Sequence, residues 1–424
     1  MALLFPRRSL ALASCALWFV PTSASAQRLV TRADAVATAL ANGSRIALAR
    51  ADTAAARARA LTAHALPNPS LAASYSKSTP QKHLSLEIPF DAPWVRSARL
   101  GAARASSRAA RLRFLSERAA AYVEVDTTYT LALAADARFR LSAQTAREAD
   151  SLRRMTIRRR DAGDASDLDV DLATVAAGQQ SNVASADSLS YMSALLTVQT
   201  LMGLPADSVT LVLADSLRLT STEMSALPSP AGVPTEAQAF PVAIDSLAAV
   251  PAVAAAAAAL QASELAMTRE RRSVFELPAL SVGVEFGDPT GAEPGLLPTV
   301  GIVLPLPLFN RNQGPIAEAG AERERARAEL IAARLETRQR LVEGRREREA
   351  LLARVARDSD LVARAQRVAA RSLTAYREGA SALPAVLEAR RSAREVLGQY
   401  IDGLAALLTV NTELRALTQT VPVP

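Results

Sequence analysis

The densest group of side chains that could do chemistry is a run of aspartates around Gly163. Its members are Asp161, Asp164, Asp167, Asp169 and Asp171. Repeated about a symmetry axis, such carboxylates would form a ring of negative charge that attracts cations at a constriction. The alternative is an acidic, solvated helix start, which the helix dipole favours. The spacing alone leaves both interpretations open.

Histidine and cysteine, which often carry catalysis or hold metals, are almost absent. His64 and His83 are the only histidines, and Cys15 is the only cysteine. No carboxylates stand at a metal-ligand spacing such as that of the H-E-x-x-H motif. We therefore expect no enzyme activity, with no catalytic residue, no cofactor and no tightly held metal ion.

The N-terminus has the order of a secretory signal peptide, with two arginines, a short apolar run and small residues ending at Ala26. We expect cleavage after Ala26, so that residues 1–26 are removed. The alternative is lipidation of Cys15, because "LASC" resembles a lipobox. Against it, only six residues separate Arg8 from Cys15, and the apolar run continues beyond the cysteine. Cleavage after Ala26 would leave no cysteine for a disulfide.

Composition favours helices. Half of the residues are hydrophobic but only 4% are aromatic, and alanine dominates, which suits close-packed helices. The formal charge of +7 becomes +5 once the two arginines of the signal are removed, since no acidic residue leaves with them. Arginine alternates with glutamate in runs such as "AERERARAELIAARLETRQR". This pattern indicates solvated helix faces with i,i+4 pairs, not a nucleic-acid surface.

One pattern is written twice along the chain. "HLSLEIPF" (83–90) aligns with "TVGIVLPL" (299–306), and "RRDAGDASDLDV" (159–170) aligns with "AYREGASALPAV" (375–386), both at an offset of 216 residues. Equal offsets imply that the intervening segments have the same length and structure. Farther upstream, "NPSLAASY" and "LPALSVGV" align at an offset of 209. The second copy therefore holds seven extra residues, which we place in a loop.

Each copy predicts the same order of elements: a helix, a β-hairpin, a long helix and a return helix. Period-two alternation predicts the hairpins, and long stretches without helix breakers predict helices of about 100 Å. The first repeat spans 27–203, with a helix over 32–65, a hairpin over 69–90, a long helix over 94–161 and a return helix over 167–202. The second spans 240–424, with a helix over 240–276, a hairpin over 278–308, a long helix over 315–378 and a return helix over 384–417. A linker over 204–239 joins them.

The predicted strands alternate in polarity. Ser85, Glu87, Ser281 and Glu285 alternate with apolar positions and should share one face. Four strands cannot close a membrane barrel, which needs about eight, and an open edge in lipid leaves backbone groups unpaired. Either the hairpins cover a soluble core, or several chains pool their strands, and a trimer would supply twelve.

These features resemble the TolC-like outer-membrane efflux proteins. The resemblance rests on the duplicated order, "LPNPSL" at 66–71, "LPLPLFNRNQG" at 304–314 and "YREGASALPAVLEAR" at 376–390. The second of these motifs is most similar to the heavy-metal efflux branch that includes CzcC and CusC. The resemblance implies a mainly α fold with a membrane β-barrel. It implies a homotrimer whose twelve strands cross outer-membrane lipid and whose coiled-coil helices form an α-barrel in the periplasm.

The resemblance also implies partners and sites. The partners are a periplasmic adaptor (membrane fusion) protein and an inner-membrane pump of the RND or ABC type. The two turns would contact the adaptor, through Gly163, Asp164, Ser166, Gly379 and Ser381. The four polar strand residues would line the barrel lumen. Candidate aperture charges are Asp169, Asp171 and Glu388. In similar proteins, acidic residues just after the turn of the second copy line the entrance. Here the second copy has Ala385 where the first has Asp169 and retains Glu388 one turn further on, which leaves open which copy lines the aperture.

The leading prediction is an exit duct of a tripartite efflux system that passively conducts its substrates, heavy-metal cations among the candidates. One alternative within transport is a type I protein-secretion outlet. An alternative of a different class is a periplasmic coiled-coil adaptor or scaffold. Such an adaptor would carry one helical hairpin between β-rich halves, whereas this chain has two copies with strand pairs.

Overall fold

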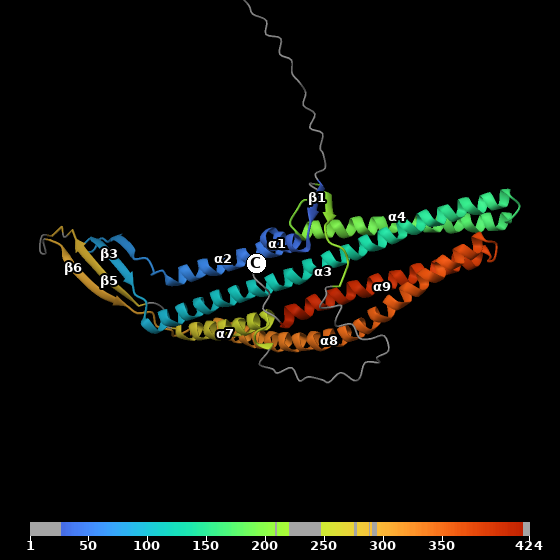
Figure 1. Cartoon of the computed structure of the whole chain (residues 1–424). Helices are drawn as coiled ribbons and strands as arrows, with labels where there is room; N and C mark the ends of the chain where they lie inside the picture. Colours follow the sequence, from blue (N-terminus) through green and yellow to red (C-terminus); the bar gives the residue numbers. More distant parts are fainter. Residues whose placement is uncertain are drawn as a thin grey trace, which may run out of the picture.

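A computed structural model describes residues 27–207, 210–219, 247–274, 278–287, 289–290 and 295–418. The predicted signal peptide, with Ala26 and Cys15, and residues 220–239 of the predicted linker lie outside this description. The chain is an elongated, gently curved rod (Figure 1). A β-sheet forms one end and two helical hairpins form the other.

Two very long helices run the length of the rod. They are α3 (Pro93–Asp161) and α8 (Gln313–Arg377). At 69 and 65 residues, each is about 100 Å long. The return helices are α4 (Asp167–Leu201) and α9 (Leu383–Thr418), and each packs on the long helix before it. Since α3 also packs on α9, the four helices lie in the order α4, α3, α9, α8.

Shorter helices accompany the sheet half of the rod. They are α1 (Arg32–Asn42), α2 (Ser44–His64) and α7 (Pro251–Arg272). The single helix predicted over 32–65 is wrong, because the chain leaves the helical conformation at Gly43. A side chain there would meet the backbone oxygen of Ala39 at 2.4 Å, so only glycine fits the break. Among the described helices, none combines the length and apolarity that a membrane span requires.

The sheet contains both predicted hairpins. Its strands are β2 (Ser70–Tyr75), β3 (Lys82–Pro89), β5 (Ala279–Phe286) and β6 (Leu297–Val303), paired antiparallel in the order β2-β3-β5-β6. The hairpin predicted over 278–308 extends too far, since β6 ends at Val303. The alternating Pro305 and Pro307 lack the N–H groups that a strand ladder requires.

A second, small sheet joins the start of the chain to the linker. Strand β1 (Gln27–Val30) pairs in parallel with β4 (Thr210–Leu213). Val30 and Leu211 are buried there in a core with Tyr129 of α3. Strand β1 precedes the first predicted helix, in a stretch where no strand was predicted. The pair fastens the beginning of the first copy to the segment that follows its last helix.

Candidate functional site

The strand register separates the sheet into two unlike faces. Glu87 pairs with Ser281, Ser85 pairs with Gly283, and His83 pairs with Glu285, so all of these residues lie on one face. The His83 Nδ1 and Glu285 Oε1 atoms are 3.3 Å apart across the strands. The four polar residues that alternation placed together are therefore brought together by the fold.

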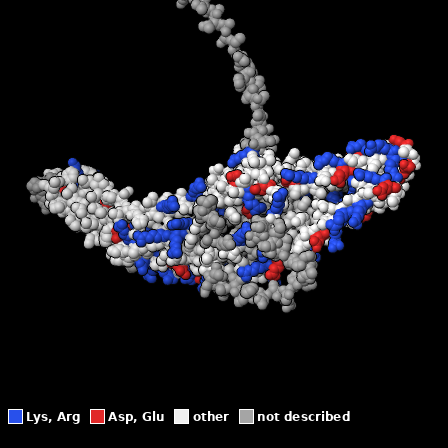
Figure 2. Space-filling view, in the orientation of Figure 1, with Lys and Arg blue, Asp and Glu red and all other residues white. Residues whose placement is uncertain are grey.

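The opposite face of the sheet is apolar and exposed. Leu86 lies opposite Val282, Ile88 lies opposite Leu280, and β6 adds Ile302. All of these side chains are at least 38% exposed. In Figure 2, the visible face of the sheet end carries very few charged atoms, whereas charged atoms are scattered over the helices. An exposed apolar patch of this extent indicates contact with lipid or another apolar surface.

The sheet is also open at both edges. Strands β2 and β6 each pair with one neighbour only among the described strands, β3 and β5 respectively. Their outward N–H and C=O groups have no ladder partner in any described strand. Such edges normally pair with another strand. A sheet with two free edges and faces of opposite polarity has the form of a segment cut from a barrel.

Each β-hairpin is followed by a junction at the start of the long helix. At this junction, hydrogen bonds connect the long helix to the shorter helix that precedes the hairpin. In the first copy, Arg99 Nε of α3 donates to the Ala63 carbonyl at the end of α2 (3.0 Å), and the guanidinium also pairs with the buried Asp91 carboxylate. In the second, Asn312 Nδ2 donates to the Glu270 carbonyl near the end of α7 (2.8 Å). Asn312 has a φ of 58°, a left-handed conformation that asparagine tolerates better than most residues.

The "FNRNQG" segment is thus a structural corner. Asn312 Nδ2 also lies 3.0 Å from Ser273 Oγ and 3.1 Å from the Glu270 carboxylate. Burial acts to raise the pKa of Glu270, but hydrogen bonds from Arg269, Asn312 and Ser273 outweigh it and leave that pKa below its usual value. The corner therefore contains a carboxylate that prefers to stay charged.

The two helical turns lie together at the other end of the rod (Figure 1). Gly163 has a φ of 85° and Gly379 a φ of 76°, which is why glycine is required at both reversals. Arg159 lies 4.7 Å above the Tyr376 ring and donates to its carbonyl oxygen. Arg159, near the end of α3, thereby connects the first helical hairpin to the end of α8 in the second.

The residues predicted to contact a partner are exposed at this end. Asp164, Ser166, Gly163 and Gly379 are exposed, and Ser381 is half-buried. The structure thus places them on one end of the rod, while their contact with a partner stays a prediction.

The candidate aperture charges have different surroundings. The Asp169 carboxylate accepts from the Ser166 backbone N–H (3.1 Å) and hydroxyl (2.9 Å), and Ser166 Oγ accepts from the Asp169 N–H, which is a capping box at the start of α4. Asp171 is exposed on the next turn. Glu388 lies on a groove of about 560 Å³ that is also lined by Arg390, Arg391 and Arg394 of α9. Asp169 thus caps the start of α4, and Glu388 shares its groove with three arginines.

No group of three or more histidine, cysteine, aspartate or glutamate side chains that could hold a metal ion occurs in the part of the chain that the structure describes.

Comparisons with known proteins bear on the first copy directly. Residues 35–204 match the model of a family described as "Outer membrane efflux protein". The matched stretch is less than half of the chain, so it shows that the first copy is similar to that family. No curated protein matched the sequence.

Solved structures extend the likeness to nearly the whole length of the chain. CusC aligns with a TM-score of 0.71 at 17% identity, over 91% of each chain. VceC of Vibrio cholerae aligns with a TM-score of 0.71 at 17% identity, over 91% of this chain and 96% of that one. The outer-membrane channel OprN aligns with a TM-score of 0.72 at 17% identity, over 92% and 91%. At these identities the likeness establishes the TolC-like fold.

The family matched by the first copy and the solved structures matched by the whole chain are outer-membrane proteins. The predicted resemblance to TolC-like proteins is confirmed, and so is the mainly α, internally duplicated fold class.

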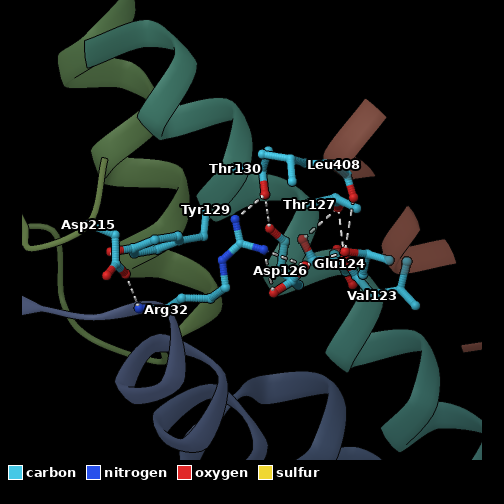
Figure 3. Close-up of polar contacts among 10 residues, drawn as sticks. Arg32, Val123, Glu124, Asp126, Thr127, Tyr129, Thr130, Asp215 and Leu408 are labelled. Atoms are coloured by element: carbon cyan, nitrogen blue, oxygen red, sulfur yellow. Dashed lines mark hydrogen bonds and ion pairs between the residues drawn. The ribbon is translucent and has the colours of Figure 1, made fainter. Parts of the chain in front are cut away.

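A buried polar node that was not predicted from the sequence joins α1, α3 and α9 (Figure 3). The Arg32 guanidinium of α1 contacts Asp126 (3.2 Å) and the Thr130 hydroxyl (2.9 Å) of α3. The Thr412 hydroxyl of α9 donates to the same Asp126 carboxylate at 2.5 Å. One carboxylate thereby joins the beginning of the first copy to the end of the second.

The linker closes the other side of the node. Asp215 accepts from the Arg32 backbone N–H (2.7 Å), and the Tyr129 hydroxyl lies 2.9 Å from both the Asp215 carboxylate and the Val30 carbonyl oxygen. Burial, together with the hydrogen bond and charge of Asp215, raises the pKa of Tyr129 well above its usual value. The only signal in the sequence was the polar pair Asp126 and Thr130 within a helix face that is otherwise apolar.

Proposed function

We propose that three copies of this chain form the exit duct of a tripartite efflux system. Each chain contributes its four strands to a twelve-stranded barrel, with Ser85, Glu87, Ser281 and Glu285 toward the lumen. The observation that carries the proposal is the open four-stranded sheet with one polar and one exposed apolar face. Edge pairing between copies would satisfy the backbone groups that lipid cannot. The two repeats, 27–203 and 240–424, would each supply half of the strands and helices.

The helices support a trimer independently. The helix order puts α4 and α8 at opposite sides of one chain. On α4, large apolar side chains recur at helical spacing and are exposed: Leu168, Leu172, Val175, Leu189, Met192 and Leu196. On α8, Leu361 and Val368 are exposed in the same way. Packing α4 of one copy on α8 of the next would bury both stripes and close the helical tunnel.

A charge placed in the α4 stripe tests the trimer. Leu189→Glu would bury a carboxylate in the interface and should convert the purified trimer to monomer. Ser190→Glu, at the next and also exposed position, is the matched control and should leave the trimer intact. The measurement is molar mass by light scattering after outer-membrane extraction. A wild-type protein that is released from membranes by salt, or that is monomeric, would overturn the proposal.

The exposed turns support docking of a periplasmic adaptor that links the duct to an inner-membrane pump. Removal of the signal would leave no native cysteine, so Ser166→Cys and Ser381→Cys would each carry a single thiol. We expect both to crosslink in cells to one periplasmic protein, whereas Ser97→Cys, near the sheet end, should not. The pump that copurifies, of the RND or ABC type, would separate efflux from type I protein secretion. Equal labelling from all three sites would contradict docking at the turns.

Heavy-metal cations are the proposed substrate class, supported by acidic side chains at the tip. Asp171→Asn and Glu388→Gln test the aperture ring better than a change at Asp169, because Asp169 also caps α4. Each should lower the cation over anion selectivity of the pore in planar bilayers. If selectivity is unchanged in the double variant, the acidic ring has no role in conduction.

A further inference from the structure

An apolar groove lies where the sheet meets the helices, on the exposed apolar face. Its volume is about 590 Å³, within the range of about 300–1,000 Å³ that is usual for ligand sites. The side chains that matter most for its chemistry are Ile88, Phe90, Trp94, Leu280, Ile302 and Leu304. None of these carries a charge, so the groove would take a hydrocarbon chain and exclude a polar ligand.

The groove lies at a particular depth along the rod. Leu280 and Ile302 sit at the ends of β5 and β6 that adjoin the helices, and Trp94 is in the first turn of α3. Trp94 is 56% exposed and Phe90 is 51% exposed. Exposed aromatic side chains at the end of a strand band are typical of the boundary between hydrocarbon and headgroups. The groove is thus continuous with the apolar face and ends at the level of the headgroups.

Positive charge stands at that end. Arg272 Nη1 donates to the Trp94 carbonyl oxygen and to Ser97 Oγ, both at 3.2 Å, which holds the guanidinium beside the groove. The last turn of α7 carries Arg269, Arg271 and Arg272, of which Arg269 pairs with Glu270, and the first turn of α3 has no acidic residue. A guanidinium is well suited to a phosphate. A ligand with an acyl chain and an anionic phosphate therefore complements both parts.

We propose that this groove binds an anionic phospholipid of the periplasmic leaflet, with one acyl chain along Leu280 and Ile302 and its phosphate at Arg272. The proposal rests on the proposed function, since it requires the sheet to lie in the outer membrane. A second copy is the less suitable occupant, because copies would pair through the strand edges and the groove opens on the sheet face. The bound lipid would fill the corner between barrel and tunnel.

The test uses the full chain, reconstituted in vesicles that contain phosphatidylglycerol with a photoreactive acyl chain. We expect labelling of peptides from β5 and β6 near the groove. Leu280→Ser should lower that labelling about tenfold, which is what one buried apolar side chain contributes to affinity. Val282→Ser is the matched control, since Val282 is on the same strand and face with nearly the same exposure, 42% against 40%, and should label normally.

The headgroup is tested separately. Arg272→Gln should remove the preference for phosphatidylglycerol over phosphatidylcholine, whereas Arg271→Gln, at the neighbouring exposed position, should keep it. Equal labelling of Leu280→Ser, Val282→Ser and wild type would overturn the proposal, as would protein-to-protein crosslinks at position 280. Flotation with the outer membrane and pore conductance are measured on the same samples. If both are normal and labelling is not specific, only the lipid site fails; if both are lost, the proposed function fails.

Discussion

The two copies of the repeat have the same order of elements but differ in their polar contacts. Helices α3 and α8 end at Asp161 and Arg377, 216 residues apart, and the turn glycines have the same offset. At that offset, however, the buried Asp126 of the first copy corresponds to Val342 in the second, which is partly exposed. Backbone geometry is thus duplicated, while the contacts that fasten the chain occur once.

The tip has the same asymmetry. Arg159 stacks on Tyr376, but the residues at the corresponding positions are Ala375 and Arg160, so no second contact of this kind is possible. A capping box starts α4, whereas the position equivalent to its serine is Ala382. Single, unsymmetrical contacts join two similar halves into one rod. We therefore expect equivalent substitutions in the two copies to change the stability of the protein by different amounts.

The largest difference is expected at the buried node. Asp126→Ala would leave the half-buried Arg32 guanidinium and the Thr412 hydroxyl without their shared carboxylate. Breaking a buried ion pair costs about 3–5 kcal/mol, so we expect about 3 kcal/mol here because Arg32 is 34% exposed. The measurement is the free energy of unfolding of the detergent-purified protein in guanidinium chloride.

The matched control for the node is Val342→Ala, at the equivalent position of the second copy. Its loss should stay under about 1 kcal/mol, as is usual for a partly exposed side chain. Equal losses in the two variants would show that the copies are fastened alike, which contradicts the comparison.

The junction should give the next largest effect. Asn312→Ala places alanine in a left-handed conformation, at a cost of about 1–2 kcal/mol, and removes hydrogen bonds to Glu270 and Ser273 worth about 1 kcal/mol. We therefore expect a loss of about 2 kcal/mol. Asn312→Gly keeps the backbone conformation accessible and should recover roughly half. If glycine and alanine unfold alike, the left-handed corner is not what orders the start of α8, and limited proteolysis there should then be unchanged.

Patterns local in sequence were enough to predict much of this fold. The hairpins, the long helices, the turn glycines and the shared face of Ser85, Glu87, Ser281 and Glu285 follow from period, propensity and a common offset. The node could not be predicted, because Arg32 and Asp126 are 94 residues apart and Thr412 is 286 residues from Asp126. Strand β1 is four residues long, and its partner β4 lies in the linker. These contacts join residues far apart in the sequence, so they depend on how the helices pack in three dimensions.

The positions of the candidate site residues could be predicted from the sequence, but the contacts that these residues make could not. Asp169 was one of several aspartates near a turn, and the structure shows that its carboxylate accepts from Ser166, three residues earlier. "FNRNQG" belonged to a motif that carried the family resemblance, and the structure shows that its Asn312 connects α7 to the start of α8. In both cases the residue type allowed two uses, and a hydrogen-bond distance decides between them.

A smaller effect is expected at the start of α4. Ser166→Ala removes the capping hydroxyl and should cost about 1 kcal/mol, seen as faster hydrogen exchange in the first turn of α4. Ser381→Ala, in the turn of the second copy, is the control and should change exchange little, since Ser381 Oγ makes only a long contact of 3.5 Å to the Ala382 oxygen. Equal acceleration at both turns would remove the distinction between the copies at the tip.

The smallest effect concerns a carboxylate found in the second copy only. Glu413 of α9 corresponds to Thr197 of α4. Burial, and then repulsion from Glu347, raise the pKa of Glu413 above its usual 4.5. The folded state therefore holds this proton more tightly than the unfolded state, so the contribution of Glu413 to stability is full below pH 4.5 and is lost as the pH rises through the raised pKa.

Glu413→Gln should therefore stabilise the protein at pH 7 and have no effect near pH 4. Because Glu413 retains solvent exposure, the gain should stay under about 0.5 kcal/mol. Glu270, whose pKa is lowered, is the control of opposite sign: its contribution is present above its usual pKa of 4.5 and is lost as the pH falls, so Glu270→Gln should destabilise at pH 7. Melting temperatures of both variants at the two pH values test this, and parallel pH slopes would show that the two carboxylates do not differ as their surroundings require.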